Sequence, residues 1–213
     1  MRILIADDHD IVREGLKTLL AAIKNFHVCG EAATGREALA LALELKPDVA
    51  VLDFFMPDLN GLEVTRQIRK ALPETEVLIL TMHDSETLAR EVLAAGARGF
   101  VVKTHAKRQL AAAVNALAQH QPFFAGTISS PALAALLQSG KSAPKIAPDR
   151  LTPREREVVQ LIAEGRTSKD IALELGLSVK TADAHRANVM RKLDLHSVSE
   201  LVRYAVRNNI VQA

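Results

Sequence analysis

The stretch Val49-Ala50-Val51-Leu52-Asp53 is an unbroken apolar run that ends on a carboxylate. A run without a polar face predicts a strand buried on both sides, as parallel sheets require. On either side of it, further β-rich runs alternate with segments whose apolar residues recur at helical spacing. The pattern predicts strands at 3–6, 28–32, 49–52, 76–80 and 99–102, and helices at 11–22, 35–45, 62–71, 86–95 and 107–118. Five such βα units predict a doubly wound α/β sheet with helices on both faces.

The alternation stops after residue 122, and the rest of the chain has a different pattern. Residues 130–138 predict a short helix, and residues 139–150 have the Ser, Gly, Pro and Ala content of a linker. Caps and apolar spacing then predict helices at 153–164, 168–175, 179–193 and 198–208. A Gly-containing turn between the second and third is typical of a helix-turn-helix. We therefore expect an α/β domain at 1–120, a linker with a short helix at 121–150 and a small all-α domain at 151–213.

Composition limits the class of protein. Of the 213 residues, 48% are hydrophobic and 24% are charged, a globular balance that excludes an intrinsically disordered chain. No apolar stretch approaches the ~18–20 residues that span a bilayer, so no membrane partner is expected. The acidic pair Asp7-Asp8 comes too early for a secretory signal, and a single cysteine, Cys29, excludes an internal disulfide. These features predict a cytoplasmic protein.

Polar residues follow four of the predicted strands, namely Asp7 and Asp8, Asp53, Thr81 and Lys103. In an open parallel sheet these strand ends meet at one edge, where ligands bind. Three converging carboxylates repel one another unless a divalent cation lies between them, and all-oxygen ligation favours Mg²⁺. The lysine and the threonine would then bind oxygens of a phosphoryl group. The sequence therefore predicts a site where an aspartate acts as nucleophile and becomes an aspartyl phosphate.

The residues around this site resemble the receiver domain of two-component response regulators. The similar motifs are Ile5-Ala6-Asp7-Asp8-His9, Val51-Leu52-Asp53 with Met56-Pro57 and Gly61, Leu80-Thr81, and Gly99-Phe100-Val101-Val102-Lys103. The resemblance covers residues 1–120 and implies a flavodoxin-like (βα)5 fold. It also implies that Asp53 accepts a phosphoryl group from a sensor histidine kinase.

The same resemblance implies roles for the neighbours of Asp53. Asp7 or Asp8 would hold Mg²⁺ together with Asp53 and the backbone carbonyl of Phe55. Thr81 would move toward the phosphoryl group, and Phe100 would rotate inward. The alternative interpretation of Phe100 is a plain core aromatic.

Two flanking residues are predicted to tune the lifetime of the phosphoryl group. Phe55, two residues beyond Asp53, would cover the site with an apolar ring, and our hypothesis is that it slows hydrolysis by excluding water. His83, two residues beyond Thr81, would flank the other side. The alternative interpretation makes both of them exposed loop residues.

The helix expected at 179–193 is amphipathic, with an inner arc made of Val179, Ala182, Val189, Met190 and Leu193. Small residues on the outer face let the backbone approach bases in a major groove, where Lys180 can reach phosphate or guanine and Asp183 can accept from cytosine. Arg186 projects inward, toward Glu155 or Glu157 of the first helix. The predicted DNA-binding residues are Ser178, Lys180, Thr181, Asp183, Ala184, His185, Ala187, Asn188 and Arg191. From the pattern alone, a surface helix of a four-helix unit is the alternative.

The sequence of this second domain resembles the LuxR-type helix-turn-helix. The similar motifs are Leu151-Thr152-Pro153-Arg154-Glu155-Arg156-Glu157-Val158, Leu177-Ser178-Val179-Lys180-Thr181, His185-Arg186-Ala187-Asn188-Val189-Met190-Arg191-Lys192-Leu193 and Glu200-Leu201-Val202. Joined to a receiver, it is similar to the NarL/FixJ family of transcriptional regulators. That family implies a homodimer on two half-sites of double-stranded promoter DNA, with the fourth helix as a dimer surface.

The function favoured by the sequence is a DNA-binding response regulator controlled by phosphorylation. It is not expected to be an enzyme, apart from Mg²⁺-dependent phosphoryl acceptance and slow autodephosphorylation. One alternative is a receiver that acts as a dimerisation or docking module without phosphorylation. Another is a Mg²⁺-dependent phosphohydrolase similar to the haloacid dehalogenases, which generally have a second Asp where this chain has Phe55, a residue with no proton to give.

Overall fold

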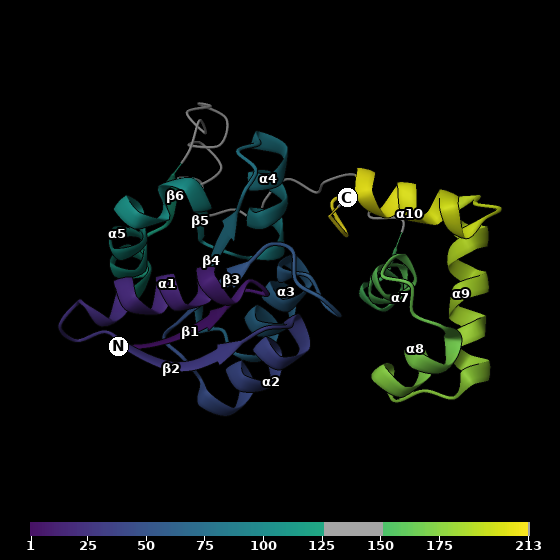
Figure 1. The fold of residues 1–213 in the computed structure, drawn as a ribbon, viewed down its shortest axis with the longest axis horizontal. Helices are drawn as coiled ribbons and strands as arrows, with labels where there is room; N and C mark the ends of the chain where they lie inside the picture. The colour runs from purple at the N-terminus through teal and green to yellow at the C-terminus, as the bar shows by residue number, and fades with distance from the viewer. Residues whose placement is uncertain (126–150, 213) are drawn as a thin grey trace. The chain divides into compact units, whose positions relative to one another are not determined.

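The structure, a computed structural model, describes residues 1–125 and 151–212 (Figure 1). The chain divides into two compact units, one containing residues 1–125 and the other residues 151–212. The short helix expected at 130–138 and the linker expected at 139–150 lie outside the described residues. In the part of the chain that is described, no helix has both the length and the apolar character needed to cross a bilayer.

The first unit is built on one parallel sheet with the strand order β2-β1-β3-β4-β5-β6. The first five strands are β1 (Arg2–Ala6), β2 (His27–Ala32), β3 (Val49–Asp53), β4 (Glu76–Thr81) and β5 (Gly99–Val102). β3 and β4 are buried along their whole length, because helices cover both of their faces. This order is that of the flavodoxin-like doubly wound fold, so the predicted fold class is confirmed.

Five α-helices flank the sheet, α1 (Asp10–Ala21), α2 (Gly35–Leu45), α3 (Gly61–Ala71), α4 (Glu86–Ala95) and α5 (Ala106–Ala118), with a 3₁₀ turn η1 (Lys103–His105) before the last. Successive strand residues point to opposite faces and enter two separate cores. Ile3 and Ile5 join the core under α1 and α5, whereas Leu4 and Ala6 join the core under α2, α3 and α4. Figure 1 shows the helices in these two layers.

A sixth strand that the sequence analysis did not predict lies at the edge of the sheet. β6 (Phe123–Ala125) pairs in parallel with β5, with Phe100 opposite Phe124. It falls inside 121–150, the segment expected to hold a linker and a short helix. Three residues directly after Pro122 are too few to produce a readable alternation, which is why the pattern did not reveal this strand.

The second unit contains four helices, α7 (Pro153–Ala163), α8 (Ser168–Leu175), α9 (Val179–Leu193) and α10 (Val198–Arg207). Thr152 and Thr167 form capping boxes at the starts of α7 and α8, and the Ser178 side chain caps α9. Gly176 ends α8 with a positive φ of 62°, a conformation that glycine adopts without a steric penalty. All four helices share one apolar core, and the predicted helix-turn-helix is confirmed.

Candidate functional site

An ion-paired cluster lies at the carboxyl ends of β1, β3 and β5. The Lys103 Nζ atom is 2.7 Å from Asp7 Oδ2 and 2.9 Å from Asp53 Oδ2. Asp7 and Asp53 are buried, with 0% and 4% of their surface exposed. Asp8 is exposed beside them, and its Oδ1 atom is 2.7 Å from His9 Nδ1. The sheet topology thus brings together the acidic residues and the lysine that the sequence predicted.

Burial sets the electrostatics of this cluster. Burial raises the pKa of Asp53 to about 6, against the opposing effect of the Lys103 charge, and the charges of Asp7 and Asp8 add to the rise. Burial alone would lower the pKa of Lys103, but the charge of Asp53 and hydrogen bonds to both aspartates raise it. Near neutral pH the site therefore contains a carboxylate that is costly to keep charged and a firmly charged ammonium group.

The donor set fits a divalent cation. Carboxylate oxygens of Asp7, Asp8 and Asp53 and a ring nitrogen of His9 all lie within 4.8 Å of one another. Hard oxygen donors from acidic side chains are what Mg²⁺ takes as protein ligands, usually one or two carboxylates plus waters. The role of the Phe55 carbonyl stays a prediction. His9 was not predicted as a site residue, although its place directly after Asp8 was a signal.

A close backbone approach holds Asp53 in place. A Cβ atom added to Gly61, the first residue of α3, would lie 2.2 Å from the Asp53 carbonyl oxygen. The Gly61 N–H donates to the Phe54 carbonyl at 2.9 Å, and the Asn60 side chain caps the same helix by accepting from the Glu63 N–H. The loop after β3 can therefore fold back on Asp53 only with glycine at this position.

Thr81 and Phe100, the two predicted switch residues, are both buried. Thr81 ends β4, one residue beyond Leu80, the register partner of Asp53. Its Oγ1 accepts a hydrogen bond from the His83 N–H at 3.1 Å. Its own hydroxyl hydrogen stays available to another acceptor. Phe100 is 0% exposed and lies parallel to Phe124 of β6, with ring planes 9° apart and ring centroids separated by 6.5 Å.

Phe55 and His83, the predicted lifetime residues, contact each other. Their rings meet edge to face with centroids 6.1 Å apart, and Phe55 also packs against Phe54 at 4.6 Å. Phe55 is half-buried and His83 is exposed. The two side chains thus lie together. His83 is an exposed loop residue, as the alternative interpretation has it, whereas Phe55 is only partly exposed. The effect of both on the lifetime of a phosphoryl group stays a prediction.

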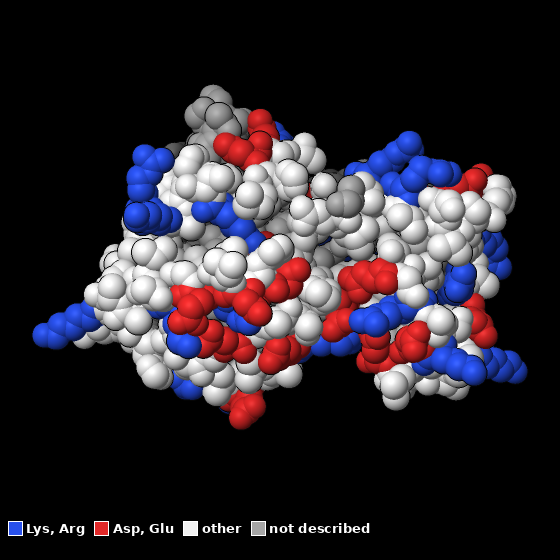
Figure 2. Space-filling view, in the orientation of Figure 1, with Lys and Arg blue, Asp and Glu red and all other residues white. Residues whose placement is uncertain are grey.

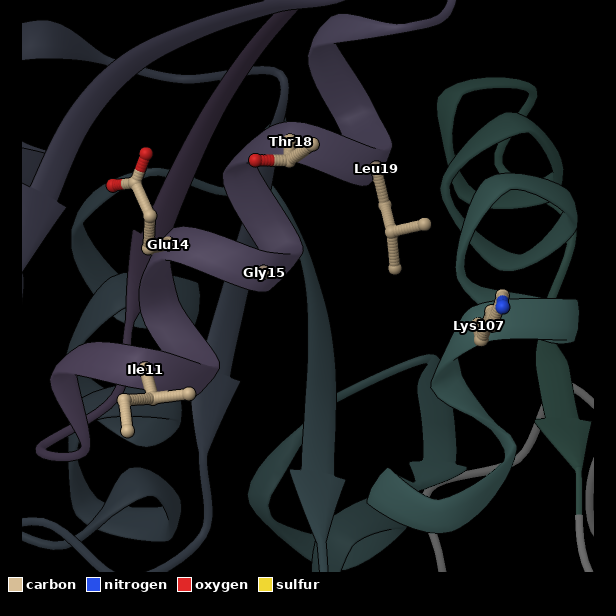
Figure 3. Close-up of a pocket in the computed structure, with 6 residues that line it drawn as sticks. All are labelled: Ile11, Glu14, Gly15, Thr18, Leu19 and Lys107. Atoms are coloured by element: carbon tan, nitrogen blue, oxygen red, sulfur yellow. The ribbon is translucent and has the colours of Figure 1, made fainter.

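A groove of about 530 Å³ runs between α1 and α5, outside the acidic cluster (Figure 3). It is lined by Ile11, Glu14, Gly15, Thr18, Leu19 and Lys107. Ile11 is 89% exposed, and in Figure 3 the Ile11 and Leu19 side chains project from α1. Although Glu14, Thr18 and Lys107 are among these residues, nearly all of the surface that faces the groove is apolar.

The second unit presents the outer face of α9 to solvent. Exposed side chains on or next to this helix comprise Ser178, Lys180, Thr181, Asp183, Ala184, Ala187, Asn188 and Arg191, and His185 is half-buried. Ala182, Val189 and Leu193 are buried beneath them, as predicted. In Figure 2, Lys and Arg side chains lie along the edge formed by α9 and α10, with acidic ones between them.

Two details of α9 differ from the prediction. Val179, expected on the buried arc, is 43% exposed, because it is the first residue of the helix and precedes the part that packs on the core. The carboxylates expected to pair with Arg186 have other cations beside them. Glu155 accepts from Lys192 Nζ at 2.6 Å, and Glu157 accepts from Arg154 at 2.7 Å.

Comparison with protein families covers both units. Residues 3–115 match the family described as "Response regulator receiver domain", and residues 149–205 match "Bacterial regulatory proteins, luxR family". The transcriptional regulatory protein LiaR of Bacillus subtilis is 36% identical over 211 residues, which is 99% of each chain. The oxygen regulatory protein NreC of Staphylococcus haemolyticus is 38% identical over 215 residues, again 99% of each chain.

Solved structures give the same picture. RcsB from Salmonella enterica serovar Typhimurium, bound to the promoter rprA in the presence of the phosphomimetic BeF₃⁻, is similar with a TM-score of 0.59 and 29% identity, covering 96% of this chain and 97% of that one. The receiver domain of the putative response regulator NarL from Mycobacterium tuberculosis has a TM-score of 0.54 and 36% identity, covering 56% of this chain and 97% of that one. With its acidic site and helix-turn-helix, the chain thus belongs to the NarL/FixJ family of response regulators and is a DNA-binding regulator of a two-component system.

Proposed function

We propose that Asp53 accepts a phosphoryl group from the phosphohistidine of a sensor kinase, and that this modification controls DNA binding. The observation that carries the proposal is the position of Lys103, 2.7 Å from Asp7 and 2.9 Å from Asp53 in a buried cluster. A cation held there by two carboxylates can pair with phosphoryl oxygens as soon as they arrive, without any reorganisation.

Each residue of the cluster has a role in the transfer. A carboxylate oxygen of Asp53 forms the new bond to phosphorus, and the P–N bond of the phosphohistidine breaks, leaving its electron pair on the imidazole. Lys103 and the Thr81 hydroxyl bind phosphoryl oxygens. Asp7 and Asp8 would hold Mg²⁺ together with Asp53, and this cation would supply positive charge to offset the charge that develops on these oxygens.

Phe55 and His83 would set how long the phosphoryl group lasts. Hydrolysis requires a water molecule in line with the bond between Asp53 and phosphorus. The half-buried Phe55 ring, held edge to face against His83, is an apolar cover on the loop that directly follows Asp53. An apolar cover excludes the attacking water and so prolongs the modified state.

The output is promoter binding by a homodimer in the cytoplasm. The exposed face of α9 supplies contacts to bases and phosphates, with Lys180 and Arg191 as its basic residues. Val198, Val202 and Val206 lie at i, i+4 and i+8 on α10 and are not fully buried by their own unit, so they form a stripe for a second copy. In a solved structure, RcsB, which has the same architecture, is bound to DNA as dimers.

The test is phosphorylation of the purified protein with acetyl phosphate and Mg²⁺, followed by intact-mass analysis. We expect wild type to gain one phosphoryl group, and Asp53→Asn or removal of Mg²⁺ with EDTA to prevent it. Asp48→Asn is the matched control, because Asp48 lies just before the opposite end of the same strand, where its carboxylate accepts from the Arg2 N–H. Unchanged labelling of Asp53→Asn would contradict the proposal.

A further inference from the structure

β6 places an aromatic ring directly against the switch residue of the receiver. Phe124 is the register partner of Phe100 on the adjacent strand, so the two side chains lie on the same face of the sheet. Their rings are nearly parallel, 9° apart, and Phe124 packs on the same core as Phe100, under α2, α3 and α4. Phe123, the preceding residue, packs on the opposite core, under α1 and α5.

The start of β6 is anchored independently of this stack. The buried Glu76 carboxylate is 2.8 Å from His120 Nδ1 and 3.2 Å from Arg98 Nη1. The Phe123 N–H donates to the Arg98 carbonyl at 2.9 Å. These contacts fix the turn between α5 and β6 at the end of the sheet opposite to Asp53. Phe124 and Ala125 lie beyond the anchor, where pairing depends on the side chains of the strand itself.

Phe100, the other ring of the stack, lies on β5, the strand that ends at the proposed acceptor site. Phe100 is three residues before Lys103, which directly follows the end of that strand. Val102 of β5 pairs with Thr81 of β4. Because the Phe100 ring is completely buried, it cannot leave its position without breaking its contact with Phe124. An inward Phe100 and a paired β6 therefore stabilise each other.

We propose that Phe124 is a positioning residue of the phosphorylation switch, which ties the inward state of Phe100 to the pairing of β6. Residues 126–150 follow Ala125 and connect the receiver to the DNA-binding domain. Whether β6 is paired with β5 therefore determines where this connecting segment begins. The inference rests on the proposed function and deepens it. It assigns the coupling to Phe124, a residue that the receiver motifs do not include.

The coupling has a reciprocal consequence. In this proposal, beryllofluoride bound at Asp53 and the Phe124 side chain both favour the inward state of Phe100. Loss of Phe124 must then weaken beryllofluoride binding by the factor that Phe124 contributes to the inward state. Aromatic pairs of this kind contribute about 2- to 12-fold to an equilibrium. Beryllofluoride in turn must strengthen the pairing of β6.

The experiment compares Phe124→Ala with Phe123→Ala, since these neighbours are both half-buried on the same short strand but face opposite cores. The probe is beryllofluoride with Mg²⁺, added to the full chain. One readout is its dissociation constant, measured by ¹⁹F NMR. The other is hydrogen exchange of the amides at residues 123–125 with and without the probe. Phe124→Leu, which keeps an apolar side chain without a ring, replaces Phe124→Ala if that variant does not fold.

We expect Phe124→Ala to weaken beryllofluoride binding about 2- to 12-fold, whereas Phe123→Ala leaves it unchanged. In wild type, the amides of β6 should exchange more slowly once the probe is bound, and Phe100→Ala should abolish that difference. Equal effects of both β6 variants, or exchange of β6 that ignores the probe, would overturn the inference. Failure of wild type to bind beryllofluoride would instead overturn the proposed function, so the two failures are distinguishable.

Discussion

Charged residues are used in opposite ways at the proposed acceptor site of the receiver (Asp7, Asp53 and Lys103) and on the outer face of α9. In the receiver, Asp7 and Asp53 are buried and paired with Lys103 over distances below 3 Å. On α9, Lys180 and Asp183 are exposed to solvent. The buried, paired charges of the receiver contribute to its free energy of folding, whereas the exposed charges of α9 stay available to bind a partner.

This difference indicates which property, stability or binding, a substitution changes at each place. A change at the acceptor site alters the stability of the receiver as well as its chemistry, because burial and desolvation enter the folding equilibrium. We expect a change on the outer face of α9 to alter DNA binding and to leave the free energy of unfolding within about 0.5 kcal/mol.

The largest expected effect is at Gly61. Gly61→Ala places a methyl group 2.2 Å from the Asp53 carbonyl oxygen, so the backbone must shift, and we expect the free energy of unfolding to fall by about 3 kcal/mol. Gly15→Ala is the control, because its Cβ meets nothing within 4 Å in the middle of α1. Better helix propensity should make it more stable by about 0.5–1 kcal/mol. Urea denaturation measures both, and similar values for the two variants would contradict the account.

The next effect is the pH dependence of stability in the presence of EDTA. The folded pKa of Asp53, about 6, lies above the unfolded value of 3.8, so the native state binds more protons between these values. The free energy of unfolding should therefore fall as pH rises from 4 to 6, by roughly 2 kcal/mol for this group. Asp53→Asn should lack this contribution. Parallel pH profiles of the two proteins would show that burial does not raise this pKa.

A smaller effect is expected at Phe55. Phe55→Asn replaces the apolar cover with a group that can orient water, and the phosphorylated protein should lose its phosphoryl group severalfold faster. Asn115→Ala, an exposed substitution on α5, should leave the rate unchanged. The decay is followed by intact mass after the phosphodonor is removed. An unchanged rate in Phe55→Asn would remove the water-exclusion hypothesis.

The smallest effect on folding is expected at Lys180. Lys180→Ala should change the free energy of unfolding by less than about 0.5 kcal/mol. It should weaken DNA binding across sequences and lower the slope of log affinity against log salt by about 1, as expected for one lost phosphate contact. Binding to a selected duplex at several salt concentrations measures the slope. A changed base preference at an unchanged slope would instead make Lys180 a base-reading residue.

The clustering of Asp7, Asp53 and Lys103 could be predicted from sequence, because all three lie at the ends of strands. Asp7, Asp53 and Lys103 each follow an apolar run, and a parallel sheet brings such ends to one edge whatever the side chains between them. The helices of the second unit were predicted nearly to the residue, because Thr152, Thr167 and Ser178 are side-chain caps whose spacing is visible in the chain.

What the sequence did not reveal depends on contacts between distant segments. β6 has three residues, so its pairing with β5 comes from tertiary packing and the anchor at Glu76 rather than from a local pattern. From the helical arc alone, Arg186 was expected to pair with Glu155 or Glu157. Glu155 instead accepts from Lys192, because a long side chain near the end of α9 reaches the start of α7, and Glu157 accepts from Arg154.

The most direct test of the central claim measures DNA affinity with and without modification of Asp53. A duplex selected from random DNA is titrated with wild type and Asp53→Asn, each in Mg²⁺ with and without beryllofluoride. The account predicts that beryllofluoride tightens binding of wild type by about 5- to 150-fold, the usual range for coupled sites, and leaves Asp53→Asn unchanged. Equal affinity of wild type under both conditions would contradict it and would make the protein a constitutive DNA-binding protein.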